Sequence, residues 1–161
     1  MLILGLDPGF AITGYGLVDS VSNHLSMVKY GAITTPAGMP FTQRLLAIRN
    51  ELNDIIREYK PEAAAIEELF FNSNTTTAIK VAQGRGVAVE TLAENSIPVF
   101  EYTPLQVKMT VVGYGRAEKN QIQQMVKMML KLDKVPKPDD AADALAIAIC
   151  HSFSRLTAKP V

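Results

Sequence analysis

The sequence has a single cysteine, no excess of either charge and no long apolar run. One cysteine, Cys150, excludes an internal disulfide and a cysteine-based zinc site, and such scarcity is typical of a reducing compartment. The amino terminus has no basic region before its short apolar stretch, and no stretch approaches the roughly 20 apolar residues that a membrane span needs. These absences predict a soluble, cytoplasmic protein with no signal peptide and no contact with a membrane.

The composition is that of an ordinary globular domain, with 48% apolar and 20% charged residues in 161. We expect a single domain over residues 1–156 and a short C-terminal tail over residues 157–161. Sixteen basic and sixteen acidic residues cancel overall, but residues 100–137 hold seven basic residues against three acidic ones. That local excess is compatible with a polyanionic ligand.

Hydrophobic periodicity predicts an α/β fold with the order βββαβαβααα. Strands are expected at 2–7, 13–19, 25–34, 62–68 and 97–103, and helices at 41–59, 74–94, 104–112, 118–132 and from 139 or 140 to about 155. Three strands at short spacing indicate an antiparallel meander, and the strand–helix–strand units that follow indicate parallel crossovers. The sequence therefore predicts a mixed sheet with helices on both faces.

Four carboxylates stand at positions where they could meet. Asp7 ends the first expected strand, Glu67 lies near the end of the fourth, and Asp140 and Asp143 are three residues apart at the start of the last helix. Open α/β sheets carry their sites at such strand ends, and residues three apart share a helix face. The alternative is that each is a separate turn or cap residue, since aspartate is common in both roles.

A cluster of carboxylates repels itself unless a cation balances it. Oxygen ligands favour Mg²⁺ or Mn²⁺ over zinc, and the sequence has no histidine and cysteine set with zinc spacing. Two such ions, about 3.5–4 Å apart, can activate water and stabilise the leaving oxygen of a phosphodiester. The pattern leaves open whether Glu67 or Glu68 faces the site, because successive strand residues point to opposite faces.

Three motifs carry a resemblance to a known family. The run Leu4-Gly5-Leu6-Asp7-Pro8-Gly9, the segment Ala65-Ile66-Glu67 followed by Phe70-Phe71, and the run that begins Asp140-Ala141-Ala142-Asp143 resemble the RuvC family of bacterial Holliday junction resolvases, within the RNase H-like superfamily. The similarity extends from residue 1 to about residue 151, with the motifs in order at compatible spacing. It implies an RNase H-like, five-stranded mixed sheet and a homodimer.

The resemblance also implies an activity and its residues. The family's activity is Mg²⁺-dependent cleavage of four-way DNA junctions, in cooperation with a branch-migration motor complex of RuvA and RuvB. Its acidic tetrad corresponds to Asp7, Glu67, Asp140 and Asp143, which selects Glu67 over Glu68. Phe70 matches an aromatic residue that stacks on a base near the junction centre. Lys108 and Lys119 match basic residues near the scissile phosphate.

Each of the DNA-binding candidates has a plainer alternative. Phe70 could be a core residue, since phenylalanine is usually buried. Lys108 and Lys119 could be solvated helix charges. Arg85, between two glycines, could contact a phosphate or solvent. His151 and Cys150, among small and branched apolar residues of the last helix, are expected to be a core histidine and an inert buried thiol.

The expected helix 74–94 is apolar on more than one face, although a helix that covers its own sheet needs one apolar stripe. Its glycines lower helix stability unless a neighbour packs closely. This surplus indicates a partner surface, most simply a second copy across a two-fold axis. The alternative is a central helix that is buried on all sides.

Three other functions are compatible with parts of this pattern. Actin-like ATPases and sugar kinases share the early glycine hairpin, but they require a second lobe that 161 residues are not expected to supply. A nuclease acting on RNA–DNA hybrids would use the same acids, and a branched-DNA binding module would have lost the chemistry. We expect a structure-selective endonuclease that makes paired symmetric nicks with 5′-phosphate and 3′-hydroxyl ends.

Overall fold

Five strands of the described chain form one mixed sheet in the order β3-β2-β1-β4-β5. The computed structural model describes residues 1–69 and 75–161. The strands are β1 (Leu2–Asp7), β2 (Ile12–Val21), β3 (His24–Thr34), β4 (Ala63–Glu67) and β5 (Val99–Tyr102). The first three pair antiparallel, whereas β4 runs parallel to β1 and β5 runs parallel to β4. The predicted meander and crossovers are therefore confirmed.

Five helices accompany the sheet within the described residues. They are α1 (Phe41–Tyr59), α2 (Thr75–Glu94), α3 (Pro104–Val111), α4 (Lys119–Met129) and α5 (Asp139–Ser154). The order of elements is the predicted one, and the main error is the end of α4, which was expected to reach residue 132. Lys131 has a φ of 53°, which stops the helix before Leu132. Leu132 still packs on the core, so its apolar spacing gave a correct contact but a wrong helix end.

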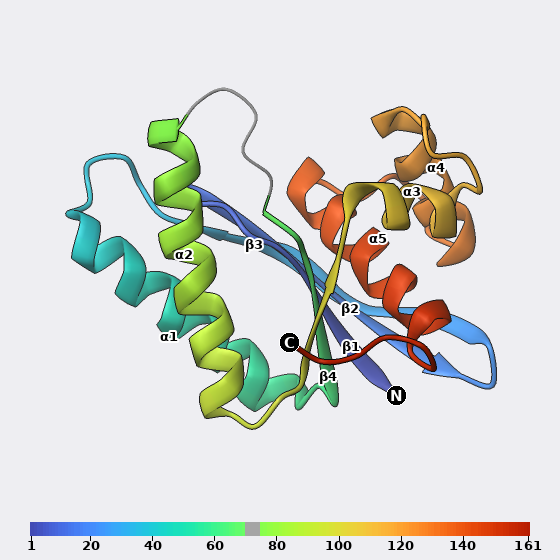
Figure 1. Ribbon diagram of the computed structural model, residues 1–161, viewed down its shortest axis with the longest axis horizontal. Coiled ribbons are helices and arrows are strands. Elements are labelled where there is room, and N and C mark those ends of the chain that lie inside the picture. Colours follow the sequence, from blue (N-terminus) through green and yellow to red (C-terminus); the bar gives the residue numbers. More distant parts are fainter. Residues whose placement is uncertain (70–74) are drawn as a thin grey trace.

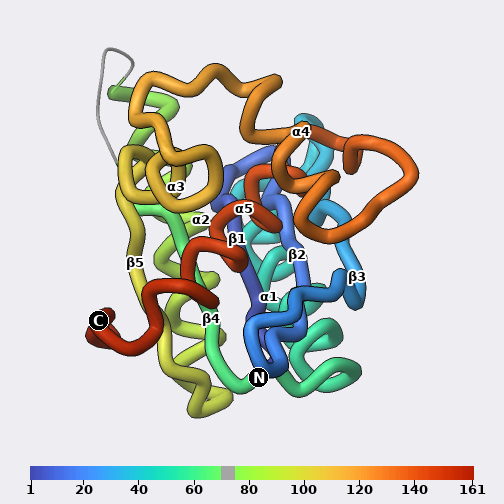
Figure 2. Tube along the Cα trace, turned by 90° about the vertical axis from the view of Figure 1, so that its right-hand side faces the viewer, coloured from blue at the N-terminus to red at the C-terminus, as the bar shows by residue number. Residues whose placement is uncertain are grey.

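The sheet separates two layers of helices (Figures 1 and 2). Leu4 and Leu6 of β1 face one layer, where they join a buried cluster with residues of α1 and α2. Ile3, on the opposite face, joins a second cluster with residues of α3, α4 and α5. This alternation along β1 follows from the two-residue period of a strand. The carboxyl ends of β1 and β4 lie at the same end of the molecule as the first turn of α5 (Figure 1).

Helix α5 lies directly on β1 and β2 because glycines leave room for it. A Cβ atom built on Gly5 would lie 2.0 Å from the carbonyl oxygen of Ala144, and one on Gly14 would lie 2.0 Å from that of Asp140. No side chain fits at such distances, so glycine is required at both positions. Every residue of α5 from 144 to 152 is buried, which makes this helix the centre of the fold.

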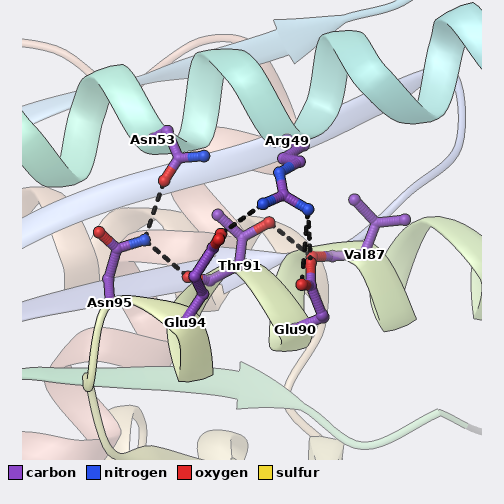
Figure 3. A network of polar contacts seen from close by, with 7 residues as sticks. All are labelled: Arg49, Asn53, Val87, Glu90, Thr91, Glu94 and Asn95. Carbon is purple, nitrogen blue, oxygen red and sulfur yellow. Dashed lines mark hydrogen bonds and ion pairs between the residues drawn. The ribbon is translucent and has the colours of Figure 1, made fainter.

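Helix α2, in contrast, is buried along a single stripe. Gly84, Ala88, Thr91 and Leu92 are its buried residues, and they face α1 and the sheet. The alternative that this helix is buried on all sides is therefore wrong. Polar contacts also join α2 to α1: Arg49 pairs with Glu90 and Glu94 (Figure 3).

The carboxyl half of α5 confirms the buried thiol and the core position of the histidine, but the histidine, expected to be fully hydrogen-bonded, keeps a buried Nε2 atom without a partner among the described residues. Cys150 and His151 are both buried, and burial raises the pKa of the Cys150 thiol. The His151 Nδ1 atom lies 2.7 Å from the hydroxyl oxygen of Tyr102. Burial, with a smaller effect of Arg155, lowers the pKa of His151 to about 4, so this histidine is neutral at pH 7.

The last residues turn back toward the edge of the sheet. The Val161 amide donates a hydrogen bond to the Val99 carbonyl at 2.9 Å, and Ala158 packs on the core. No helix in the described parts of the chain is long and apolar enough to cross a membrane.

We predict that Gly14→Ala destabilises the protein by about 1–3 kcal/mol, because the new methyl group forces α5 away from β2. Gly38→Ala is the matched control, since a Cβ atom there meets nothing within 4 Å. It should change the free energy of unfolding by less than about 1 kcal/mol. Urea denaturation of both variants measures the difference, and equal stabilities would show that α5 does not need the close approach.

Candidate functional site

Asp7 and Glu67 end two neighbouring parallel strands and face the same helix. Gly5 pairs with Ala65 in the register of β1 and β4, and Gly5 and Ala65 both lie on the α5 side of the sheet. Asp7 and Glu67 follow these residues by two positions, so their side chains point to that side as well. Glu68 therefore points to the opposite face, and its amide donates a hydrogen bond to the Tyr102 carbonyl at 2.9 Å. The strand geometry places Glu67, and not Glu68, beside Asp7.

The first turn of α5 brings two more carboxylates to this end of the sheet. Asp140 lies over β2 through the close approach of its own carbonyl to Gly14, and Asp143 is one turn further along. The N-cap of α5 is Pro138, and no side chain caps the helix. The alternative that these aspartates serve as N-caps is therefore wrong.

Burial and mutual repulsion dominate the electrostatics of this group. Burial, followed by the charges of Asp143, Glu67 and Asp140, raises the pKa of Asp7 from 3.8 to about 8. The pKa values of Glu67 and Asp143 are also raised, in both cases mainly by burial and in both cases against the opposing effect of Lys119. Carboxylates that perturb one another in this way form one electrostatic unit.

Lys119 supplies a positive charge to this unit from the start of α4. Its Nζ atom lies 3.2 Å from Asp143 Oδ2 and 3.8 Å from Asp139 Oδ2. Burial alone would lower the pKa of Lys119, but the hydrogen bond and charge of Asp143 raise it overall. A capping box between Glu118 and Gln121 fixes the helix start that carries this lysine.

Lys108 approaches the same place from α3, where a capping box of Thr103 and Gln106 fixes the helix start. Lys108 and Lys119 line a cavity of about 210 Å³ together with Glu67 and Asp143. The other residues that line this cavity are apolar: Pro104, Val107, Ile122, Ala146 and Ile147. The two lysines therefore face the carboxylates instead of only solvent.

The other two predicted DNA-binding residues, Phe70 and Arg85, are not among the residues that line this cavity in the described chain. Phe70 lies outside the described residues. Arg85 extends from α2 on the other face of the sheet, where its guanidinium group pairs with Glu101 and its Nε donates to the Glu67 carbonyl at 3.4 Å. Arg85 is thus engaged with the ends of β4 and β5 and is not a neighbour of the two lysines in the cavity.

The donor chemistry fits a divalent metal ion. Asp7, Glu67, Asp140 and Asp143 offer only oxygen ligands, the type that Mg²⁺ and Mn²⁺ prefer. Burial and neighbouring negative charges raise the pKa values of Asp7, Glu67 and Asp143, and a cation would balance that excess of negative charge. Among the residues that the structure describes, no three acidic, histidine or cysteine side chains converge as a ready-made metal cage. Asp143 is instead turned to Lys119.

Sequence reasoning missed two contacts of this site. The pairing of Lys119 with Asp143 joins residues 24 positions apart, and no local pattern indicates it. Glu101 was counted only as a charge, although it holds Arg85. Its position between Phe100 and Tyr102, which face the α5 layer, could have shown that Glu101 points to the α2 side.

Comparisons with known proteins agree with this geometry. The family model described as "Crossover junction endodeoxyribonuclease RuvC" matches residues 3–151. A relative of that name from Ruminiclostridium cellulolyticum is 60% identical over 154 residues, which are 96% of this chain and 93% of the relative.

Two solved structures resemble the whole chain. The Thermus thermophilus RuvC structure has a TM-score of 0.92 and 33% identity, and covers 100% of both chains. T. thermophilus RuvC in complex with a Holliday junction substrate has a TM-score of 0.94 and 34% identity, with 100% of this chain and 99% of that one covered.

We predict that Asp7→Asn raises the melting temperature of the metal-free protein at pH 8 but not at pH 4. The folded protein keeps a proton on Asp7 between its ordinary pKa of 3.8 and the raised value of about 8. The unfolded chain loses that proton, so the stability of the wild type falls as pH rises through this interval. Thermal melts at both pH values measure the effect. A constant difference between variant and wild type would contradict it.

Proposed function

The chain belongs to the RuvC family of crossover junction endodeoxyribonucleases, and we propose that it cuts four-way DNA junctions at the site formed by Asp7, Glu67, Asp140 and Asp143. One observation carries the assignment of the site. Carboxylates from β1, β4 and α5 share one end of the sheet and perturb one another's pKa values, and two lysines stand beside them. An acidic site with cations at its rim suits a phosphodiester substrate.

The carboxylate set would hold Mg²⁺, with Mn²⁺ as a substitute and two ions as the expected number. When bound, such ions supply an activated water and stabilise the charge on the leaving oxygen. Asp7 would gain most from a bound cation, because burial and then the charges of its acidic neighbours raise its pKa to about 8. Metal binding requires deprotonated carboxylates, so it should strengthen as pH rises toward 8.

The reaction is hydrolysis of one phosphodiester bond in each of two strands. The oxygen of a water molecule bonds to phosphorus, the bond from phosphorus to the 3′ oxygen breaks, and the proton from water balances the charge of the departing oxygen. The products are a 5′-phosphate and a 3′-hydroxyl. Lys119 and Lys108, which line the cavity with Glu67 and Asp143, would bind the phosphate oxygens and offset their charge. Phe70, just after β4, would stack on an unpaired base.

A homodimer would supply two sites for the two strands. The outer side of α2 is only partly covered: Ile79 is 57% exposed, and Val87 lines an apolar groove with Leu45 and Leu46 of α1. This groove supports a second copy packed against α2, the partner that the surplus of apolar residues on this helix predicts. Family membership further favours action with a RuvA–RuvB branch-migration motor, in the cytoplasm where the DNA is.

The proposed activity is tested with three substrates in parallel: a synthetic four-way junction, a plain duplex and an RNA–DNA hybrid, each with and without Mg²⁺. Paired symmetric nicks confined to the junction and dependent on Mg²⁺ are expected. Cleavage of the hybrid would favour a ribonuclease with the same acids. Junction binding without any nick would favour a binding module.

We predict that Asp143→Asn separates binding from cleavage. The substitution keeps the side-chain volume but removes one anionic ligand from the carboxylate set, so nicking in Mg²⁺ should fall by at least about 100-fold. DNA binding should persist, because it depends on phosphate contacts and junction shape. A gel-shift titration and a nicking assay on the same protein measure the two effects. Near-normal cleavage by a folded variant would remove Asp143 from the site.

Sedimentation tests the dimer. At micromolar concentration the protein should sediment at roughly twice 17.6 kDa, and Ile79→Glu should shift it toward the monomer, because a charge at a desolvated interface is unfavourable. The exposed Phe153, on α5 in the other layer, provides the control: Phe153→Glu should leave the dimer intact. A monomeric wild type that still makes paired cuts would contradict the proposed symmetry.

A further inference from the structure

One turn of α2 touches the backbone behind both strand-borne carboxylates, although α2 lies on the opposite face of the sheet. A Cβ atom on Gly84 would lie 3.0 Å from the carbonyl oxygen of Gly9, two residues after Asp7. The next residue, Arg85, donates from Nε to the carbonyl oxygen of Glu67 at 3.4 Å. Consecutive residues of one helix therefore contact the chain at the end of β1 and at the end of β4.

Arg85 is itself held in place. Its guanidinium group forms an ion pair with Glu101 of β5, and the side chains of Arg85 and Glu101 are 17% and 27% exposed. A guanidinium group has several donors in a fixed plane, so one arginine can bridge the Glu101 carboxylate and the Glu67 carbonyl at once. Partly buried pairs are also screened less by salt than surface pairs.

We propose that Arg85 is a positioning residue, which fixes the end of β4 so that the Glu67 carboxylate stays directed at the metal ligands Asp7 and Asp143. This inference rests on the proposed function of the site. Arg85 touches the backbone of Glu67 and not its carboxylate, so it acts through the strand end. Gly84 has no side chain, so α2 can approach Gly9 closely and hold the chain that follows Asp7.

Helix α2 would thus have two roles: one side would bind the second copy, and the other would hold the ends of β1 and β4. The stripe that contains Gly84 faces the sheet, and Ile79 is exposed to the exterior. A partner packed against α2 would thus press on the same helix that holds the ends of β1 and β4. Outer-shell contacts of this kind typically change metal affinity or activity by about 10–100-fold when they are removed.

The experiment uses Arg85→Ala and Arg85→Lys in the full-length protein. Mn²⁺ is titrated into the DNA-free protein by calorimetry, and junction binding and nicking are measured separately. We expect Arg85→Ala to raise the Mn²⁺ dissociation constant about tenfold or more. The kcat for nicking should fall while the KM for the junction stays within about twofold. Arg85→Lys, whose ammonium group cannot bridge both acceptors in one plane, should give an intermediate Mn²⁺ affinity.

Arg49→Ala is the matched control. Arg49 of α1 also forms ion pairs with carboxylates of another element, Glu90 and Glu94 of α2 (Figure 3). Those contacts join α1 to α2 and involve none of the four carboxylates. Arg49 and Glu90 also line the apolar groove of the proposed dimer, so sedimentation of the variant is measured alongside. Removing them should leave Mn²⁺ affinity unchanged, so a general loosening of α2 would be recognised by equal effects of the two alanine variants.

Three results would overturn the inference. The first is an unchanged Mn²⁺ affinity in Arg85→Ala or, should that variant fail to fold, in Arg85→Lys. The second is weaker junction binding with a shallower salt dependence and normal Mn²⁺ affinity, the behaviour of a phosphate contact. Equal effects of Arg49→Ala and Arg85→Ala on Mn²⁺ affinity would also overturn it. A wild type that binds Mn²⁺ but makes no nick in the junction would refute the proposed function instead.

Discussion

The contact between α5 and the glycines of β1 and β2 is the constraint on which the rest of the molecule depends. Gly5 and Gly14 let the helix backbone approach the strand backbone, and the short side chains of the buried alanines in α5 permit the same close packing. This contact fixes the height of the helix above the sheet and therefore the position of its first turn. Asp140 and Asp143 reach the ends of β1 and β4 because the helix axis lies so close.

The carboxylates meet at an energetic cost that the fold must bear. Ionising Asp7 is unfavourable until about pH 8, and Lys119 balances only part of the group from the Asp143 side. Close packing elsewhere stabilises the protein enough to tolerate this repulsion. In the proposed function the same repulsion would favour a bound cation, since a metal ion would neutralise the acids and recover the free energy lost in bringing them together.

Much of the fold could be predicted because its elements carry strong local patterns. The stripe of Ile48, Leu52 and Ile56 in α1 and the alternation of β1 gave correct element types. The sequence pattern did not identify α5 as the central helix, since its alanines carry a weak hydrophobic signal. It assigned that possibility to α2, where the surplus apolar residues are exposed. Central burial is set by the glycines of β1 and β2, and those lie far from α5 in the sequence.

The candidate site divides along the same line. Asp7, Asp140 and Asp143 could be predicted from the sequence, because a strand end and an i, i+3 spacing are local features. The pattern left Glu67 and Glu68 open, and the family resemblance selected Glu67. The contacts of Lys119 with Asp143 and of Arg85 with Glu67 and Glu101 could not be predicted. These contacts join residues 16 to 24 positions apart in different elements, and only the folded arrangement of the elements brings them together. A mutational scan of this chain would therefore record losses at Gly5 and Gly14 as well as at the four acids. Such a scan measures the loss of function alone, so it cannot distinguish a residue that performs the chemistry from one whose missing side chain makes room for it.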